Sequence, residues 1–570
     1  MKKNIIIYIF TILAIVGILI YGNSLLFGSD IQKNKAYELD VKEWNTVKAY
    51  SINKTNIVAN IDSRQIKSNV AGIYMNDSMA LMIPVDQIRE AFDCAVLIYN
   101  DGRILIQNGN DTISIDTKQD NCTVNDTDSF RLVCDRMNGR YCIPVNIICD
   151  TFGYQYSFDI SQNLATIISS DPDRKTIPYA YNYEVVGRAP RVSNQGNLGT
   201  CWAFASLTAI SSTLLPTEAE IFSVDHMSMN NSYHFSQADG GESTMAMAYL
   251  LAWQGPVLER DDPYGDGVSD STLKPVKHVQ EVQTVETKDL DLIKKLVFKY
   301  GGVQSSFYAS NLNNYTGTKY YNKYTNSYCY IGDEKPNHDI VIIGWDDNYS
   351  GDNFNISVEG DGAFLCRNSW GDSFGDNGNF YISYYDSNIG LHNVVYTKVE
   401  NANNYDNIYQ TDLCGYVGKL GYDEDYAYFA NAYTPITDEE LAAVGFYATG
   451  DNTEYSIYIC EDFDGVNSLN KRSDPVMTGQ LKNSGYYTIN LDNTVKLKKD
   501  KKFAVIVRIN TPNSGRPVAV ECAYTTGDND ADIILDDGEG YVSLKGTNWA
   551  NTESQHKCNV CLKVYTNNMS

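Results

Sequence analysis

The C-terminal part of the chain, residues 401–566, is dominated by short runs in which apolar residues occupy every second position. Turn-forming Asn, Asp and Gly separate these runs from one another. Period-two alternation is typical of strands that bury one face. We therefore predict an antiparallel β-sandwich there, with strands at 455–460, 486–491, 503–508, 518–522 and 561–565.

A different pattern repeats itself between residues 31 and 175. The sequence Ile83-Pro84-Val85 recurs as Ile143-Pro144-Val145, and each copy leads through a short amphipathic stretch to alternating strand-like residues. The second strand of each copy falls at 103–107 and 164–168. This duplication predicts a small α/β domain built from two similar units.

The middle of the chain, residues 176–400, contains a helix-length apolar run that begins directly after Cys201 and extends over 202–210. A run that is apolar on all sides predicts a buried helix. Gly196 and Gly199 precede it in a loop. Cys201 would therefore lie at the positive end of the helix dipole, which favours the thiolate.

The first 30 residues form a predicted targeting segment. Lys2 and Lys3 precede an uncharged stretch that runs from residue 4 to residue 29. The length and the flanking charges fit either a retained signal anchor or a cleaved signal peptide. Both predict export, with the rest of the chain at the outer face of the cell membrane or secreted to the envelope.

The charge balance of the chain argues against some classes of binding partner. The chain carries 45 Lys and Arg against 71 Asp and Glu, a net charge of −26. This large negative net charge argues against nucleic acid and anionic membrane surfaces as partners.

The cysteine content is compatible with disulfide bonds and also with buried free thiols. There are thirteen cysteines, an odd number. If one is a free nucleophile, the others permit disulfides but do not require them. His556, Cys558 and Cys561 have no second cysteine pair at zinc-finger spacing. We predict no metal and no cofactor.

Four polar residues in the middle region have the chemistry of acyl transfer. Cys201 supplies a nucleophile, and His338 a base that can accept its proton. Asn368 can hydrogen-bond the other ring nitrogen and fix the tautomer. Gln195 lies close enough in sequence to point its amide at a developing oxyanion, beside the Cys201 backbone N–H.

The same residues carry a family resemblance over roughly residues 188–385. The order Gln, Cys, His, Asn and the sequence Asn368-Ser369-Trp370-Gly371 resemble the papain-like cysteine proteases. The resemblance implies a two-lobed catalytic domain, one lobe helical and one a β-barrel. It also implies that Gly240 and Gly241 form a substrate wall and that Trp370 shields the Asn368–His338 hydrogen bond. Two cysteines that form a disulfide in plant and lysosomal members are missing at Leu198 and near Asp239.

Two acidic residues suggest a substrate preference. By alignment with the family, Glu242 and Asp339 fall near the subsite for P2, the substrate residue before the one that carries the scissile carbonyl (P1). Two acids there would favour a basic P2 side chain.

The flanking regions carry resemblances of their own. Residues 31–175 are similar to the small N-terminal domain of some copper amine oxidases, without a histidine cluster for copper. Wall binding, regulation of the protease and a spacer role remain open. Residues 401–566 are similar to a lectin-like domain fused to bacterial papain-like peptidases, and sugar binding is implied by that similarity alone. The acidic stretch 528–537 is either a calcium loop or a solvated turn.

These expectations combine into one prediction. The fold is multidomain α+β: a targeting segment (1–30), the duplicated α/β domain (31–175), the two-lobed peptidase (176–400) and the sandwich (401–566). The function is an exported cysteine endopeptidase of the bacterial cell envelope, acting on protein or peptide substrates. The alternatives are a cell-wall Cys-His amidase or transpeptidase, and a carbohydrate-binding adhesin with a vestigial protease.

Overall fold

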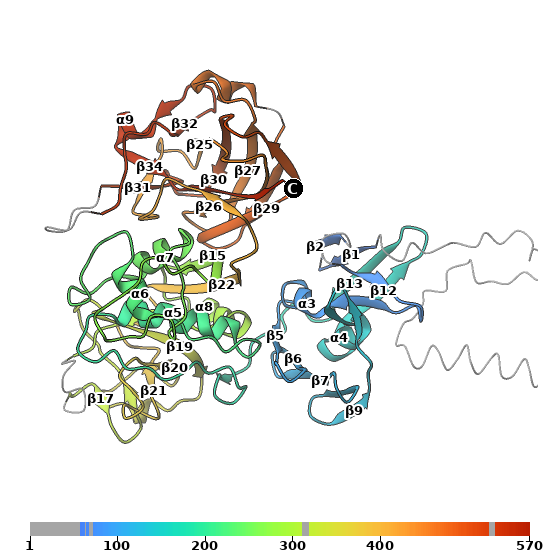
Figure 1. The fold of residues 1–570 in the computed structure, drawn as a ribbon. Coiled ribbons are helices and arrows are strands. Elements are labelled where there is room, and N and C mark those ends of the chain that lie inside the picture. The colour runs from blue at the N-terminus through green and yellow to red at the C-terminus, as the bar shows by residue number, and fades with distance from the viewer. Residues whose placement is uncertain are drawn as a thin grey trace, which may run out of the picture. The chain divides into compact units, whose positions relative to one another are not determined.

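The computed structural model describes residues 57–62, 64–67, 72–310, 318–472, 474–523 and 531–569. The targeting segment predicted at 1–30 lies outside these residues. Within the described ranges, no helix combines the length and apolar character needed to cross a bilayer. The chain divides into two compact units, residues 1–178 and 179–570 (Figure 1).

The first unit shows the predicted duplication in three dimensions. Strands β4 (Leu81–Pro84) and β11 (Arg140–Pro144) end with the Ile-Pro of the two Ile-Pro-Val sequences and pair antiparallel, with Ile83 opposite Ile143. Pro84 and Pro144 take the N-cap positions of helices α3 (Val85–Ala91) and α4 (Val145–Phe152). Gly153, in the left-handed conformation at φ 71°, ends the second helix.

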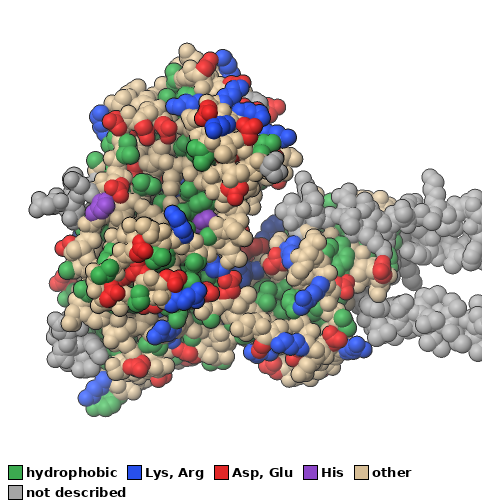
Figure 2. All heavy atoms as spheres, viewed as in Figure 1, with side chains coloured by type: hydrophobic (Ala, Val, Ile, Leu, Met, Phe, Trp, Pro, Cys, Tyr) green, Lys and Arg blue, Asp and Glu red, His purple; other side chains and the backbone are tan. Residues whose placement is uncertain are grey.

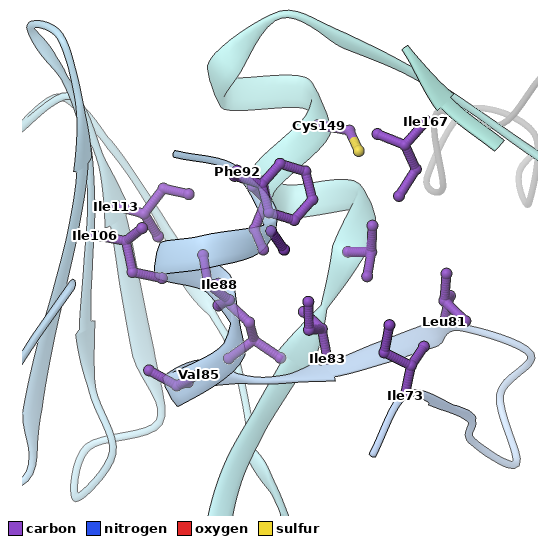
Figure 3. Packing of buried hydrophobic residues seen from close by; sticks show 14 of the residues in the cluster. Ile73, Leu81, Ile83, Val85, Ile88, Phe92, Ile106, Ile113, Cys149 and Ile167 are labelled. Atoms are coloured by element: carbon purple, nitrogen blue, oxygen red, sulfur yellow. The ribbon is translucent and has the colours of Figure 1, made fainter. Parts of the chain in front are cut away.

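The two copies share one hydrophobic core. Ile88 and Phe92 from the first copy pack with Cys149 and Ile167 from the second, all at most 1% exposed (Figure 3). The elements of this unit are β1 (Val58–Ile61), β2 (Arg64–Lys67), β3 (Tyr74–Met75), β4 (Leu81–Pro84), α3 (Val85–Ala91), β5 (Ala95–Ile98), β6 (Arg103–Asn108), β7 (Asp111–Asp116), β8 (Asn121–Val124), β9 (Asp128–Arg131), β10 (Asp135–Met137), β11 (Arg140–Pro144), α4 (Val145–Phe152), β12 (Tyr154–Asp159) and β13 (Leu164–Ser169).

The first half of the second unit has a helical part and a sheet part. Helix α5 (Cys201–Leu214) packs on strands β19 (His338–Asp346) and β22 (Asn393–Asn401) of the sheet and on helices α6 (Val224–Met229) and α7 (Ser243–Leu251). The elements here are β14 (Ala180–Asn182), α5 (Cys201–Leu214), α6 (Val224–Met229), α7 (Ser243–Leu251), β15 (Lys277–Val285), α8 (Leu290–Lys299), β16 (Val303–Phe307), β17 (Tyr321–Asn322), β18 (Ser327–Tyr328), β19 (His338–Asp346), η3 (Gly351–Asn353), β20 (Ala363–Arg367), β21 (Asn379–Ser383) and β22 (Asn393–Asn401).

The second half of this unit is the predicted sandwich, and all five predicted strands are present. Most of its buried apolar side chains, among them Phe446 and Val507, form one cluster, and a second, smaller cluster includes Leu469 and Ile506. The elements are β23 (Asn407–Tyr409), β24 (Gly418–Leu420), β25 (Tyr426–Tyr433), β26 (Glu439–Ala448), β27 (Thr453–Cys460), η4 (Val466–Lys471), β28 (Met477–Leu481), β29 (Gly485–Leu497), β30 (Phe503–Asn510), β31 (Val518–Cys522), β32 (Gly540–Ser543), β33 (Ala550–Asn551), α9 (Thr552–His556), β34 (Cys558–Val560) and β35 (Leu562–Asn568).

One sheet runs through both halves of the second unit. Strand β15 pairs with β22 on one edge and with β29 of the sandwich on the other. Strand order in the sheet then continues through β26 to β35. The hydrogen bond from Gln410 Nε2 to Ala252 O, at 3.0 Å, adds a second connection. The sandwich is therefore joined to the first half of the unit (residues 179–401) by strand pairing and a hydrogen bond.

No cysteine forms a disulfide, and the surface carries mixed charges (Figure 2). All thirteen cysteines are free thiols; ten are buried, and Cys134, Cys201 and Cys522 are partly buried. On the face drawn in Figure 2, acidic and basic side chains are interspersed.

Candidate active site

Cys201 is the first residue of α5, directly after the N-cap Thr200. The backbone N–H groups of a first helical turn have no partner inside the helix, so they face whatever lies at its N-terminus. The sulfur also receives the backbone N–H of Asp339, the residue after His338. The start of α5 and the start of β19 therefore meet at this thiol.

His338 is the first residue of β19 and is 3% exposed. Its Nε2 lies 2.8 Å from Asn368 Oδ1. The same oxygen accepts the backbone N–H of Ser369 at 2.8 Å, which identifies it as the amide oxygen. An oxygen can only accept, so Nε2 carries the ring proton and Nδ1 is left as the proton acceptor.

Aromatic rings enclose the imidazole. Trp370 packs over His338 with ring centroids 4.6 Å apart and an interplanar angle of 31°. Phe307 meets it edge-on at 5.7 Å. Phe374 supports the tryptophan from the side at 5.0 Å. His338 and Asn368 are at most 3% exposed beside these rings. Shielding of their hydrogen bond by Trp370 stays a prediction.

Gln195 is held at both ends of its amide. Its Oε1 accepts the Ser369 hydroxyl at 2.7 Å, and its Nε2 donates to Leu198 O at 2.9 Å. An amide nitrogen carries two protons, so one remains for another acceptor. The Tyr264 hydroxyl donates to Gln195 O at 2.9 Å and lies 2.7 Å from Thr200 Oγ1. Tyr264 thereby connects the Gln195 backbone to the residue before Cys201.

Burial disfavours a single charge on either Cys201 or His338. Burial, with the nearby Asp339 carboxylate, raises the pKa of the Cys201 thiol to about 12, against the backbone N–H groups of Asp339 and Trp202. Burial lowers the pKa of the His338 imidazole to about 4. A lone thiolate and a lone imidazolium are both unfavourable here. Moving one proton from sulfur to Nδ1 creates the two charges together, so each stabilises the other.

Gly240 and Gly241 lie against the segment that carries Cys201. Gly199 N donates to Gln237 O at 2.8 Å. A Cβ on Gly199 would come within 2.9 Å of Gly240 Cα, and a Cβ on Gly241 within 2.4 Å of Trp202 Nε1. Glycine is required at these positions because any side chain would push the wall and the helix apart.

The two predicted acids have different surroundings. Asp339 is half-buried and accepts the Ser306 hydroxyl at 2.6 Å and Gln304 Nε2 at 2.8 Å. Glu242 is exposed and is the N-cap residue of α7. Burial raises the pKa of the Asp339 carboxyl, and the charge of Glu242 raises it further. Glu242 is therefore close enough to Asp339 for its charge to affect the ionisation of the Asp339 carboxyl.

Several residues at this site were not singled out from the sequence. Ser369 belongs to the quoted motif, but its hydrogen bond to Gln195 carries no sequence signal. Tyr264, Gln304, Ser306 and Phe307 come from separate segments, and only the fold brings them to the site.

The described residues contain no group of three or more His, Cys, Asp or Glu placed to hold a metal ion. Cys558 begins β34, and both it and Cys561 are buried. Part of the acidic stretch predicted as a calcium loop or a solvated turn, residues 528–530, lies outside the described residues.

Comparison with family models separates the chain into three matched regions. Residues 180–399 match the papain family cysteine proteases. Residues 408–566 match a lectin-like domain, and residues 60–168 match the copper amine oxidase N-terminal domain. All three resemblances drawn from the sequence are confirmed.

Individual relatives match the middle region. A cysteine protease of Blomia tropicalis is 24% identical over 242 residues, covering 39% of this chain and 65% of the relative. Cathepsin L 1 of Paramecium tetraurelia is 28% identical over 200 residues, covering 34% of this chain and 55% of the relative. The chain thus spans between about half and two thirds of the length of these curated relatives.

Two solved structures share more of the architecture. The clostridial cysteine protease Cwp84 after propeptide cleavage is 25% identical with a TM-score of 0.61, covering 68% of this chain and 99% of that one. A structure of the protease and lectin-like domains of Cwp84, a surface layer associated protein of Clostridium difficile, is 26% identical with a TM-score of 0.59, covering 69% and 89%. The predicted combination of a papain-like fold and a lectin-like sandwich is confirmed.

Proposed function

We propose that this chain, whose residues 180–399 form a papain-family cysteine protease domain, is an endopeptidase that works through Cys201, His338 and Asn368. The observation that carries the proposal is the buried hydrogen bond between His338 Nε2 and Asn368 Oδ1 at 2.8 Å. It leaves Nδ1 as the acceptor for the thiol proton at the N-terminus of α5.

The reaction begins with transfer of the Cys201 proton to His338 Nδ1. The thiolate attacks the carbonyl carbon of P1, and the carbonyl oxygen becomes an oxyanion. The Cys201 backbone N–H and the free proton of Gln195 Nε2 stabilise that charge. His338 then protonates the leaving amine, and the C–N bond breaks to leave a thioester on Cys201.

Hydrolysis of the thioester reverses these roles. His338 removes a proton from water, which attacks the thioester carbonyl and passes through a second oxyanion at the same donors. The carboxylic acid product leaves, and the proton held by His338 returns to the sulfur. Asn368 keeps the ring in the required tautomer throughout, because its oxygen accepts from Nε2 in both protonation states.

The acids at the cleft favour a basic P2 side chain. The carboxylates of Asp339 and Glu242 interact with each other, and the backbone N–H of Asp339 contacts the Cys201 sulfur. A Lys or Arg at P2 would pair with carboxylates that a leucine would leave unpaired on desolvation.

We further propose that the protein is exported to the cell envelope and that its lectin-like region binds carbohydrate. The matched lectin-like domain and the description of Cwp84 as surface layer associated support both ideas. Fractionation of cells with N-terminal sequencing of the product would distinguish a retained signal anchor from a cleaved signal peptide. Recovery of the full chain in the cytoplasm would contradict export.

The direct test of the catalytic proposal is covalent labelling of the full chain with an epoxysuccinyl cysteine-protease probe. Mass mapping of the adduct identifies the modified residue. We expect labelling of Cys201, its loss on denaturation, and none in Cys201→Ala, although the other twelve thiols remain in that variant. Equal labelling of several cysteines, surviving denaturation, would overturn the proposal.

A further inference from the structure

A pocket of about 440 Å³ lies where the catalytic half meets the sandwich. Its wall on the catalytic side includes Asp239, Gly240, Gly241 and Glu242. Its opposite wall includes Tyr416 and Val417, which belong to the lectin-like region. We call this space the composite pocket.

The composite pocket shares the glycine wall with the nucleophile. Gly240 packs on Gly199 and Gly241 packs on Trp202, so the pair separates the pocket from the start of α5. A substrate strand bound along this wall would alternate its side chains between opposite sides. If P2 points toward Asp339, the preceding residue, P3, points the other way, toward the composite pocket.

The segment that carries Tyr416 is firmly placed. Tyr233 of the catalytic half donates its hydroxyl to Cys414 O at 2.6 Å. Cys414 N donates to Glu521 Oε1 at 2.6 Å, and Val417 N donates to Val520 O at 3.0 Å. The first bond joins the two halves of the unit at the pocket, and the other two fix the segment within the lectin-like region, so Tyr416 is part of a preformed wall.

The ion pair of Asp412 and Lys563 supports the same segment. Their side chains are at most 1% exposed, and the atoms lie 2.9 Å apart. The Tyr416 ring also packs on Tyr447, with centroids 5.3 Å apart. The ring is thus supported from behind while remaining only half-buried itself.

The lining fits a long cationic side chain. Tyr233 and Phe235 are stacked with centroids 6.5 Å apart, and Met245 adds apolar surface. Asp239 and Glu242 contribute carboxylates, and among the described residues that line the pocket none is Lys, Arg or His. Aromatic faces and carboxylates together attract a cation, while apolar surface covers its aliphatic stem.

Hydrogen bonds from Ser236 fix the orientation of the Asp239 carboxylate. Its Oδ2 accepts the Ser236 hydroxyl at 2.6 Å and the Ser236 backbone N–H at 3.1 Å. These hydrogen bonds hold the pKa of the Asp239 carboxyl below its usual range, so it stays ionised at neutral pH.

We propose that the composite pocket is a substrate subsite, built jointly by the protease and lectin-like regions, that binds a Lys or Arg side chain at P3. The inference rests on the proposed peptidase function and deepens it. The lectin-like region then takes part in choosing the scissile bond, because Tyr416 and Val417 would contact the substrate directly.

The test compares the full chain on fluorogenic peptides that differ only at P3, with Lys, Arg, Ala or Glu. We expect wild type to prefer Lys and Arg over Ala. Tyr416→Ala should reduce that preference about fivefold in kcat/KM, with the Ala peptide changed less than twofold. Tyr422→Ala is the matched control, since Tyr422 is a 38% exposed tyrosine of the same region that does not line the pocket.

A second variant acts from the catalytic side. Thr244 lines the pocket, and Thr244→Lys should reverse the preference toward Glu. Equal losses on all four peptides in Tyr416→Ala, or a wild type indifferent to P3, would overturn this inference while leaving the peptidase intact. Inhibition by a free oligosaccharide that depends on Tyr416 would make the pocket a sugar site instead. Cleavage of no peptide by wild type would be a failure of the proposed function itself.

Discussion

Ser369 donates its hydroxyl proton to Gln195 Oε1 at 2.7 Å. The same residue gives its backbone N–H to Asn368 Oδ1 and accepts the Gln195 backbone N–H, each at 2.8 Å. One serine therefore holds both the Gln195 amide and the Asn368 amide, which accepts from His338. In the proposed mechanism, stabilisation of the oxyanion and the tautomer of the base would then depend on one another through this contact.

We expect Ser369→Ala to lower kcat about tenfold while KM changes little, because the Gln195 amide loses the bond that orients it and its contribution is made mainly in the transition state. Steady-state kinetics on one peptide would show this. Ser369→Thr retains a hydroxyl and is the matched control. A rise in KM at unchanged kcat in Ser369→Ala would place the serine in ground-state binding instead.

The order of elements was accessible from the sequence because local patterns determine it. Period-two runs located strands such as β27 and β31, and the repeated Ile-Pro-Val sequences located α3 and α4. Pairing between distant segments has no comparable local signal. The continuation of the sheet from β15 to β29 joins two regions that the sequence divides cleanly.

The residues of the candidate site show the same contrast between local motifs and contacts made only on folding. Cys201, His338 and Asn368 were predicted because acyl transfer requires those side chains in a recognisable setting. Neighbouring residues of the site were not predicted, because Tyr264 and Ser306 are ordinary polar residues until folding brings them beside Gln195 and Asp339. The part played by Tyr416 depends on how two regions pack, which no motif encodes.

Stability should depend on pH through His338. Burial lowers its pKa in the folded protein to about 4, below the usual value of 6.5. The unfolded chain therefore binds a proton first as pH falls, and the free energy of unfolding should fall between pH 6.5 and 4. The contribution is about 3 kcal/mol for a shift of this size. Urea denaturation of wild type and His338→Gln across this range measures it, and parallel pH profiles for the two proteins would contradict it.

Preference for a basic P2 residue should depend on both acids and on pH. Asp339 pairs with a cation only when ionised, and burial together with Glu242 raises its pKa. The ratio of kcat/KM for P2 Lys to P2 Leu should therefore rise with pH and fall about tenfold in Asp339→Asn. Glu242→Gln should move the rise to lower pH, because it removes a like charge. An apolar preference unchanged by either substitution would reject the idea.

The glycine wall offers a test of substrate alignment that is separate from the chemistry. A Cβ at position 241 would lie 2.4 Å from Trp202 Nε1, a contact too close to keep. Gly241→Ala must therefore displace the wall or the first turn of α5, which carries Cys201. We expect kcat/KM to fall at least tenfold, because a small displacement of bound substrate from the nucleophile is costly. If the wall moves and the helix stays, the epoxysuccinyl probe will still label Cys201 while peptide turnover drops. Wild-type turnover in Gly241→Ala would show that substrates do not bind along this wall.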